Sequence, residues 1–310
     1  MAPLDRASAT CQNRLIVMSN NSTATGVVLV IISSVSFGAM ALFARFAYAD
    51  GVTPISLLFI RFTLAAVIMI GIARMRGEAM PRGRTLLGFA LMGGVGYVGQ
   101  SLSFFTALTM ANAGLVALLL YLYPAIVALL SAIFRGERLT GYRIFAVVLA
   151  LAGTALTVGP QLDARPLGVL LGIGAALIYS VYIMAGTSLL RGAAPIASSA
   201  VILSAAAVFA GLALAQGVTL PTGPGGWIGV AGVAIVATVV AVTTFLMGLK
   251  LIGPTRASVL STLEPVTTVV LAALLLGEPI GPWTAVGGAL ILAGALMLSL
   301  SRRPAATHPS

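Results

Sequence analysis

The sequence is poor in charge, cysteine and histidine, and each shortage excludes a class of protein. Only 8% of its 310 residues are charged, whereas soluble globular domains carry about 25%. The single cysteine, Cys11, cannot form a disulfide within the chain, and the single histidine, His308, lies near its end. The apolar segments therefore lack the commonest metal ligand and a histidine proton relay. We expect no metal centre and no cofactor.

Apolar residues take the place of the missing charge. They make up 59% of the chain, and the mean hydropathy is +1.10, which predicts an integral membrane protein with several helices in the lipid bilayer. The formal net charge of +10 is typical of nucleic-acid binding only when the basic residues cluster on one solvated face. Here they lie in short segments between apolar runs, so we expect no nucleic-acid partner.

An enzyme is not expected. A serine–histidine hydrolase needs a histidine beside its nucleophile, and His308 lies outside the apolar runs. The three aspartates, Asp5, Asp50 and Asp163, also lie outside them, which argues against an aspartyl site within the membrane. No glycine-rich nucleotide loop follows a predicted strand.

Ten apolar segments are long enough to be membrane spans, each of which needs about 20 residues. Residues with turn chemistry separate them, among them Asp50-Gly51 and Gly253-Pro254. The predicted fold class is all-α integral membrane, with ten transmembrane helices at residues 26–48, 54–73, 86–109, 114–134, 142–160, 167–190, 195–215, 226–249, 256–276 and 282–301.

The distribution of lysine and arginine predicts the orientation. Cytoplasmic loops carry the excess of both residues. With the N-terminus inside, 14 of the 17 basic residues lie in cytoplasmic segments, Arg165 lies outside, and Arg45 and Arg61 fall within spans. The apolar run at residues 15–18 is too short for a secretory signal. We therefore expect a multi-pass protein of the plasma (inner) membrane, with cytoplasmic tails at residues 1–22 and 302–310.

The two halves of the chain repeat each other. Residues 119–138 align with residues 260–279 at a constant offset of 141, so that Pro124 matches Pro265 and Gly136-Glu137 matches Gly277-Glu278. This predicts a repeat of five spans at residues 23–160 and a second at 161–301. Because five is odd, the second repeat enters the membrane from the opposite side. Inverted repeats of this kind are typical of transporters that work by alternating access.

The second repeat also contains the LEPV sequence at 263–266. This sequence, the two glycine–glutamate pairs, the span count and the repeat together resemble the EamA family of the drug/metabolite transporter superfamily. The resemblance covers about residues 26–300. It implies a plasma-membrane carrier of small metabolites, often an exporter. It also implies a central cavity lined by spans 1–4 and 6–9, with spans 5 and 10 at the periphery.

Glu264 is the first candidate for the transport site. It lies about eight residues into the ninth predicted span, where a charge costs at least ~2.5 kcal/mol. Pro265 removes a backbone donor and clashes with the carbonyl four residues earlier, near Ser261, so we expect a kink that frees carbonyls beside the carboxyl group. Pro124 repeats this arrangement in the fourth span, with Tyr123 in place of the acid. In this position the carboxyl group of Glu264 could bind and release a proton during transport. The alternative is a structural acid that is bonded to a neighbouring helix.

Arg61 is the second charge at mid-depth. Its guanidinium group suits a bidentate bond to a carboxylate substrate or a pair with Glu264. The alternative is that it extends toward the membrane surface along its aliphatic stem or ties helices together. For Arg45, three residues from the end of the first span, we expect the surface-directed position.

Several other polar residues are weaker candidates. Serine and threonine are also ordinary contacts between membrane helices, so a packing role is the alternative for each. Tyr121 and Tyr123 flank Leu122, which predicts that their side chains point to different faces. The further candidates for the cavity wall are Ser33, Ser34, Ser36, Gln100, Tyr179, Tyr182, Thr243 and Thr244.

Two features have structural interpretations. Glu137 and Glu278 lie just before spans 5 and 10, where an acid is stabilised by the dipole of the helix that follows. Gly287, Gly288 and Gly294 permit close packing of the tenth span and indicate a possible homodimer contact.

The sequence thus predicts a secondary transporter for a small metabolite, either amino-acid-like or another small amphipathic solute. We expect proton-coupled export by alternating access, with the small-molecule substrate, protons and the lipid bilayer as partners. A passive facilitator or uniporter, or an importer, is the alternative.

Overall fold

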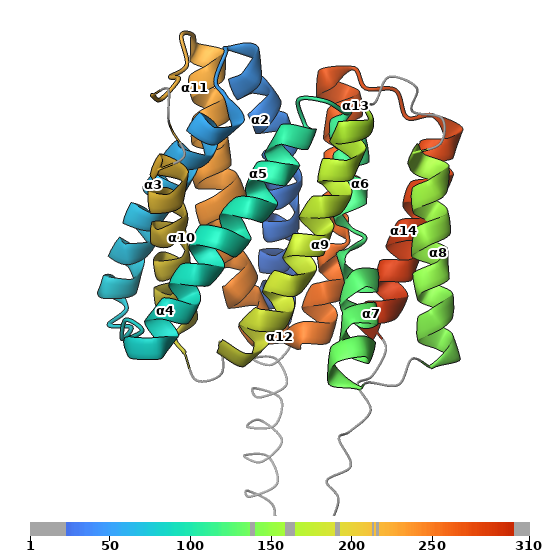
Figure 1. Cartoon of the computed structure of the whole chain (residues 1–310), viewed down its shortest axis with the longest axis horizontal. Coiled ribbons are helices and arrows are strands. Elements are labelled where there is room, and N and C mark those ends of the chain that lie inside the picture. Colours follow the sequence, from blue (N-terminus) through green and yellow to red (C-terminus); the bar gives the residue numbers. More distant parts are fainter. Residues whose placement is uncertain are drawn as a thin grey trace, which may run out of the picture.

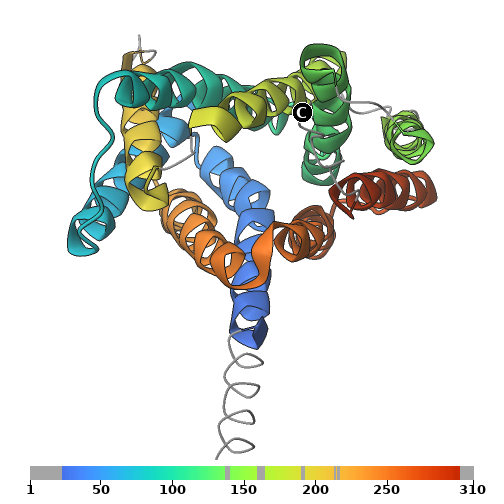
Figure 2. The ribbon, with the colours of Figure 1, turned by 90° about the horizontal axis from the view of Figure 1, so that it is seen from below.

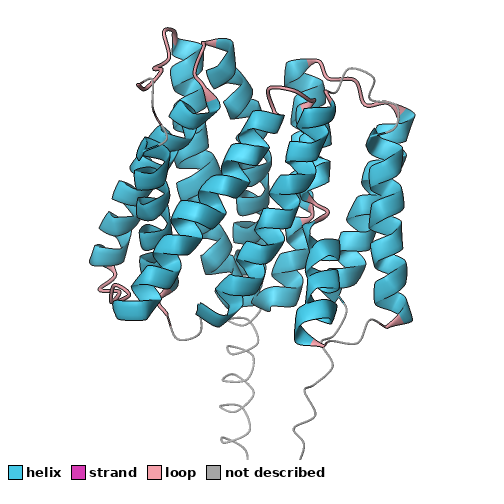
Figure 3. Ribbon diagram, viewed as in Figure 1, coloured by secondary structure: helices cyan, strands magenta, loops and turns pink. Residues whose placement is uncertain are grey.

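The structure, a computed structural model, is built from helices joined by short turns (Figure 3). It describes residues 23–136, 140–158, 165–189, 193–212, 214 and 217–300, and within these ranges no residue belongs to a β-strand. The predicted tails at 1–22 and 302–310, and Glu137, lie outside the described residues.

Residues 23–38 form the first helix, which is interrupted at Ala39. The helices that follow (Figure 1) are α2 Met40–Ala49, α3 Pro54–Met75, α4 Gly83–Leu91, η1 Met92–Tyr97, α5 Val98–Ala107, α6 Ala113–Leu120, α7 Tyr123–Arg135, α8 Gly141–Val158, α9 Pro166–Leu189, α10 Pro195–Leu212, α11 Pro224–Ala231, η2 Gly232–Val240, α12 Ala241–Ser261, α13 Leu263–Leu276 and α14 Pro282–Leu300.

Seven helical stretches of the described chain are long and apolar enough to cross a bilayer: Thr23–Ala49, Pro54–Met75, Gly83–Ala107, Ala113–Phe134, Pro166–Gly186, Pro195–Leu212 and Pro224–Leu249. The protein is therefore a multi-pass membrane protein. The other three predicted spans correspond to the shorter apolar helices Gly141–Leu156, Leu263–Leu276 and Pro282–Leu298, so ten crossings stay a prediction.

The glycines of the two glycine–glutamate pairs have a local explanation. Gly136 ends α7 and Gly277 ends α13, both in the left-handed conformation with φ of 64° and 68°. A residue without a Cβ adopts this conformation freely and closes the last helical turn.

One predicted helix end is wrong. The turn expected at Gly253-Pro254 lies inside α12, which continues to Ser261, and the interruption comes at Thr262. A proline removes one helical hydrogen bond and can bend a helix without ending it.

Helices α8 and α14 pack against each other at one edge of the bundle (Figures 1 and 2). Gly153 of α8 lies against the backbone of Gly287 and Ile291, and Gly294 of α14 lies against Ala146 and Ala150. Gly288 faces Leu118 of α6. These glycines therefore make close helix contacts within the chain, as the packing interpretation predicts, and a homodimer stays a prediction.

Positions 141 residues apart share unusual backbone. The π-helical segments η1 and η2 lie at matching positions of the two repeats. At the offset of 141 residues, Met92 matches Val233 and Tyr97 matches Thr238. Matching helices run in opposite directions along the bundle: α7 runs toward the bottom of Figure 1 and α13 toward its top.

Candidate functional site

Three helices are interrupted close to one another. The fourth predicted span breaks at Tyr121 and Leu122, just before Pro124, and the ninth at Thr262, three residues before Pro265. The interruptions expected beside these two prolines are thus confirmed. The first helix is interrupted at Ala39 alone, beside Gly38, and the backbone bonds from Ala39 to Val35 and from Phe43 to Ala39 are kept.

Gly38 brings the break in the first helix against the start of α13. A Cβ at residue 38 would lie 2.6 Å from the carbonyl oxygen of Glu264 and 2.6 Å from Cβ of Thr267, so only glycine fits at this distance. The Thr268 hydroxyl donates a hydrogen bond of 2.9 Å to the Gly38 carbonyl. These contacts hold Glu264 beside the first helix.

Tyr121 joins the two proline-linked breaks. Because Pro265 has no N–H, the Ser261 carbonyl is free to accept another donor, and the Tyr121 hydroxyl donates to it at 2.6 Å. The same hydroxyl lies 3.1 Å from Oε2 of Glu264. The freed carbonyl near Ser261 and its place beside the carboxyl group agree with the sequence-based expectation.

The position of Glu264 along its helix differs from the expectation. It lies in the first turn of α13 rather than eight residues inside a continuous helix, because the helix begins anew at Leu263. Its side chain is half-buried and helps to line a pocket, together with Phe37, Phe104 and Tyr121.

Arg61 of α3 is 2% exposed. Its Nε donates to Oγ1 of Thr238 at 2.8 Å, and its Nη2 donates to the Tyr97 hydroxyl at 2.9 Å. The guanidinium carbon lies 5.3 to 5.6 Å from the ring centres of Phe62, Tyr97 and Phe105, within the range of cation–π attraction. Arg61 is therefore enclosed by protein and does not extend to the membrane surface.

Arg61 and Glu264 make no ion pair with each other, so the pairing alternative is wrong. A continuous row of aromatic side chains runs from the partner of Arg61 to the partner of Glu264. Consecutive ring centres are 5.0 to 6.1 Å apart. The tyrosine row consists of Tyr97, Tyr182, Tyr179, Tyr123 and Tyr121.

The prediction that Tyr121 and Tyr123 point to different faces is wrong. The rings of Tyr121 and Tyr123 are 5.8 Å apart, although their spacing in a regular helix would direct them to different faces. The helix is broken between them, so helical periodicity does not apply there.

The other predicted site residues are less engaged. Gln100 is 8% exposed, and its Oε1 accepts a bond of 3.3 Å from the adjacent Ser101. Ser36 is 6% exposed, and its side chain makes no hydrogen bond to another described residue. Pro124 lies in the first turn of α7, next to Tyr123.

Tyr97 and Thr238, which hold Arg61, were not predicted. The sequence contains a signal for them, because they occupy matching positions in the two repeats. Neither has a neighbouring proline or charge, so only the position of Arg61 in the fold gives them a role.

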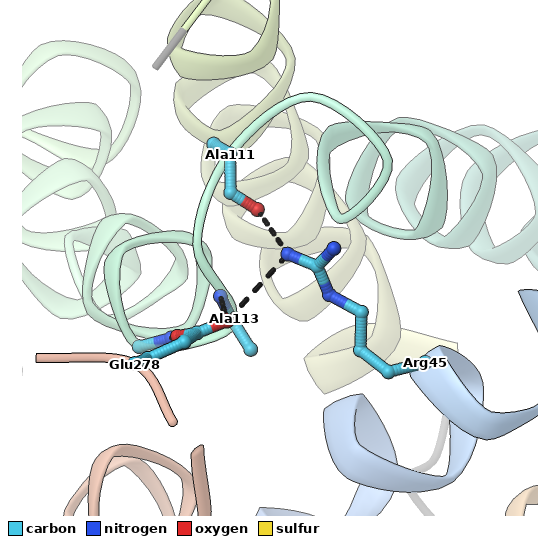
Figure 4. Close-up of polar contacts among 5 residues, drawn as sticks. Arg45, Ala111, Ala113 and Glu278 are labelled. Carbon is cyan, nitrogen blue, oxygen red and sulfur yellow. Dashed lines mark hydrogen bonds and ion pairs between the residues drawn. The ribbon is translucent and has the colours of Figure 1, made fainter. Parts of the chain in front are cut away.

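A second polar cluster joins α2, the start of α6 and the loop before α14 (Figure 4). Nη2 of Arg45 donates to the Ala111 carbonyl at 2.7 Å and lies 3.6 Å from Oε1 of Glu278. The backbone N–H groups of Ala113 and Gly114 donate to Glu278 at 2.9 and 3.2 Å. We call this cluster of Arg45, Glu278 and the backbone of residues 111–114 the Arg45–Glu278 clasp.

The clasp changes two expectations. Arg45 binds the chain instead of simply extending to the membrane surface. Glu278 caps α6 from the loop before α14, rather than the helix that follows it. The dipole argument applies, but to a helix far away in sequence.

We expect the clasp to stabilise the protein through coupled interactions. Glu278→Gln removes a charged helix cap, and Arg45→Met removes its cationic partner, so each change should lower the free energy of unfolding by ~0.5–2 kcal/mol. The double variant should lose less than the sum, by roughly 0.2–1 kcal/mol, because the two residues share one contact. Thermal unfolding of the four purified proteins measures both quantities; strict additivity would contradict the coupling.

Interrupted membrane helices that hold ionisable groups within the bundle are typical of membrane transporters. The model of the EamA-like transporter family matches residues 24–159 and, a second time, residues 166–300. The chain belongs to this family, which is consistent with the drug/metabolite transporter superfamily.

Two relatives and one solved structure span nearly the whole chain. An uncharacterized transporter of Archaeoglobus fulgidus is 26% identical over 272 residues, which are 88% of this chain and 95% of the relative. The aromatic amino acid exporter YddG of Ancylobacter novellus is 27% identical over 280 residues, 87% of this chain and 97% of the relative. A crystal structure with 23% identity has a TM-score of 0.64 and covers 88% of this chain and 96% of its own, which supports the fold.

Proposed function

We propose that the protein is a proton-coupled exporter of a small amphipathic or zwitterionic metabolite in the plasma membrane, and that it works by alternating access. The observation that carries this proposal is the carboxyl group of Glu264 at the meeting point of three interrupted helices, bonded to Tyr121 of the other repeat. The distribution of basic residues favours an orientation with both termini in the cytoplasm.

The contacts of Tyr121 fit a carboxyl group that gains and loses a proton. The hydroxyl carries one hydrogen and faces two acceptors, the Ser261 carbonyl and Glu264. When Glu264 is ionised, the hydroxyl can donate its hydrogen to the carboxylate. When Glu264 is protonated, its own hydrogen can be donated to the hydroxyl oxygen, which then donates to the Ser261 carbonyl. Loading and release would change the bonds between the two repeats at their breaks.

The repeat supports alternating access. Matching helices run in opposite directions (Figure 1), as in an inverted repeat, where exchanging the conformations of the halves changes which side is open. The clasp joins the two repeats at the end of the bundle that the distribution of basic residues predicts to lie outside. Opening that side would separate Arg45 from Glu278.

The substrate and direction can be identified together by profiling metabolites. Cells that express the protein are compared with cells that carry the empty vector, and a solute enriched in the medium is the expected result. The purified protein in liposomes should then show counterflow of that solute, which a channel cannot produce. Depletion of the solute from the medium would indicate import. A flux that rises with solute concentration without saturating, and that shows no counterflow, would indicate a passive pore.

The named relative supports an amino-acid-like solute. YddG of Ancylobacter novellus is an aromatic amino acid exporter, and the tyrosine row offers aromatic surface inside this bundle. We therefore include aromatic amino acids among the solutes to be measured.

A further inference from the structure

Arg61 carries a charge that the described part of the chain does not neutralise. Its side chain is almost fully buried, and the ion pair found among the described residues joins two other residues, Arg45 and Glu278. Buried charges are ordinarily paired, because an uncompensated charge inside a protein or a membrane is costly. The three aromatic rings around the guanidinium offset part of this cost. They carry no negative charge, so the guanidinium still has no anion beside it.

The surroundings of Arg61 orient the guanidinium and leave donors available. A guanidinium has five N–H donors, and two of its nitrogens, Nε and Nη2, bond to Thr238 and Tyr97. Nη1 makes no hydrogen bond to a described residue. A carboxylate accepts two parallel N–H bonds from such a fork.

The two residues that orient Arg61 belong to the π-helical segments, at matching positions of the two repeats. Segments of this kind are frequent at functional sites, where the extra residue widens the helix and redirects side chains. Arg61 is thus bonded to one residue of each repeat, so a movement of either repeat would change its hydrogen bonds. A side chain that only fills space would not need a partner in both repeats.

We propose that Arg61 binds the carboxylate of the transported solute, and that the tyrosine row contacts its apolar body. The solute class is a small monocarboxylate with an apolar, preferably planar, body; aromatic amino acids belong to this class. The inference rests on the proposed transport function and deepens it, because it separates the anion site at Arg61 from the proton site at Glu264.

The charge and the tyrosines select against other solutes. A phosphate carries close to two charges at neutral pH, and a single guanidinium with neutral partners matches one charge. Four members of the row, Tyr97, Tyr182, Tyr179 and Tyr123, are half-buried, so the described part of the chain does not cover them completely. Aromatic faces and edges bind planar apolar groups with favourable geometry.

The experiment measures binding directly, apart from transport. The thermal stability of the purified protein in detergent is titrated with pairs of probes that share a body and differ in the carboxylate: L-phenylalanine with L-phenylalaninamide, 3-phenylpropionate with 3-phenylpropanamide, and L-leucine with L-leucinamide. The variants are Arg61→Gln, Arg61→Lys and Glu264→Gln. Arg61→Lys keeps the charge without the fork and provides a second folded variant if Arg61→Gln is unstable.

We expect at least one carboxylate to stabilise the native protein at a concentration about tenfold or more below that needed for its amide. Arg61→Gln should abolish this preference, Arg61→Lys should weaken it, and Glu264→Gln should retain it. An amide as effective as its carboxylate, a preference that survives in both Arg61 variants, or no stabilisation by any probe would overturn the inference. Binding that depends on Arg61 in a protein that shows no counterflow would keep the anion site and reject the proposed transport.

Discussion

Replacing Glu264 by glutamine is expected to abolish proton-driven accumulation of the solute and to leave its exchange intact. Glutamine has nearly the shape of the protonated acid but cannot release a proton. In liposomes with an imposed pH gradient, the native protein should concentrate the solute against its gradient, whereas Glu264→Gln should only equilibrate it. Counterflow without a pH gradient should continue, because the loaded carrier can still change its conformation.

Tyr121→Phe is the matched control for this prediction. It removes the hydroxyl that bonds Ser261 and Glu264 but keeps the carboxyl group, so transport should become slower and remain dependent on pH. Equal accumulation by native protein and Glu264→Gln, at matched amounts in the membrane, would reject Glu264 as the proton site and make it a structural acid. Loss of accumulation and counterflow together in Glu264→Gln would assign it a role in binding the solute.

Much of the helical architecture could be predicted from apolar length and turn chemistry. The start of α3 agrees with the expected residue, because Thr53 and Pro54 form a cap and first turn. The end of α12 was misplaced because Gly-Pro is also compatible with a bent helix. The break at Ala39 has no proline or terminal glycine of its own, and it becomes understandable only from the contact of Gly38 with α13.

The candidate site could be predicted only in part. Glu264 and Arg61 stand out in the sequence because a charge in an apolar run is costly. Their partners do not, since Tyr97 and Thr238 are ordinary residues of apolar helices. Tyr121 bonds Glu264 because two breaks in different repeats lie side by side, and periodicity along one helix cannot show this. The same limit applies to Glu278, whose partners at residues 113 and 114 are more than 160 positions away.

The two charges of the candidate site differ in how the fold holds them. Glu264 lies at a break, in the first turn of a helix, with one hydroxyl beside its carboxyl group. Arg61 lies within the continuous helix α3 and is held by the π-helical segments of two neighbouring spans. The first arrangement suits a group whose bonds change during the cycle, and the second suits a rigid anchor.

Gly93→Ala is expected to destabilise the protein strongly, because η1 has no room for a methyl group there. A Cβ at this position would fall on the carbonyl group of Ile202 in α10, which is backbone and cannot rotate away. Overpacking of this kind costs typically ~1–3 kcal/mol, and the separation of η1 from α10 would also move Tyr97, the partner of Arg61. Thermal unfolding of the purified protein, together with its yield in the membrane fraction, measures the loss.

Gly99→Ala provides the matched control in the helix that continues from η1. The nearest atom to its added Cβ is Cδ1 of Ile178 at 3.9 Å, an ordinary van der Waals distance, so no neighbour has to move. Alanine also lowers the conformational entropy of the unfolded chain and should leave stability unchanged or raise it by ~0.4–1 kcal/mol. If both variants unfolded at the native temperature, η1 and α10 would not be in close contact. The position of Tyr97 beside Arg61, which depends on that contact, would then have to be abandoned.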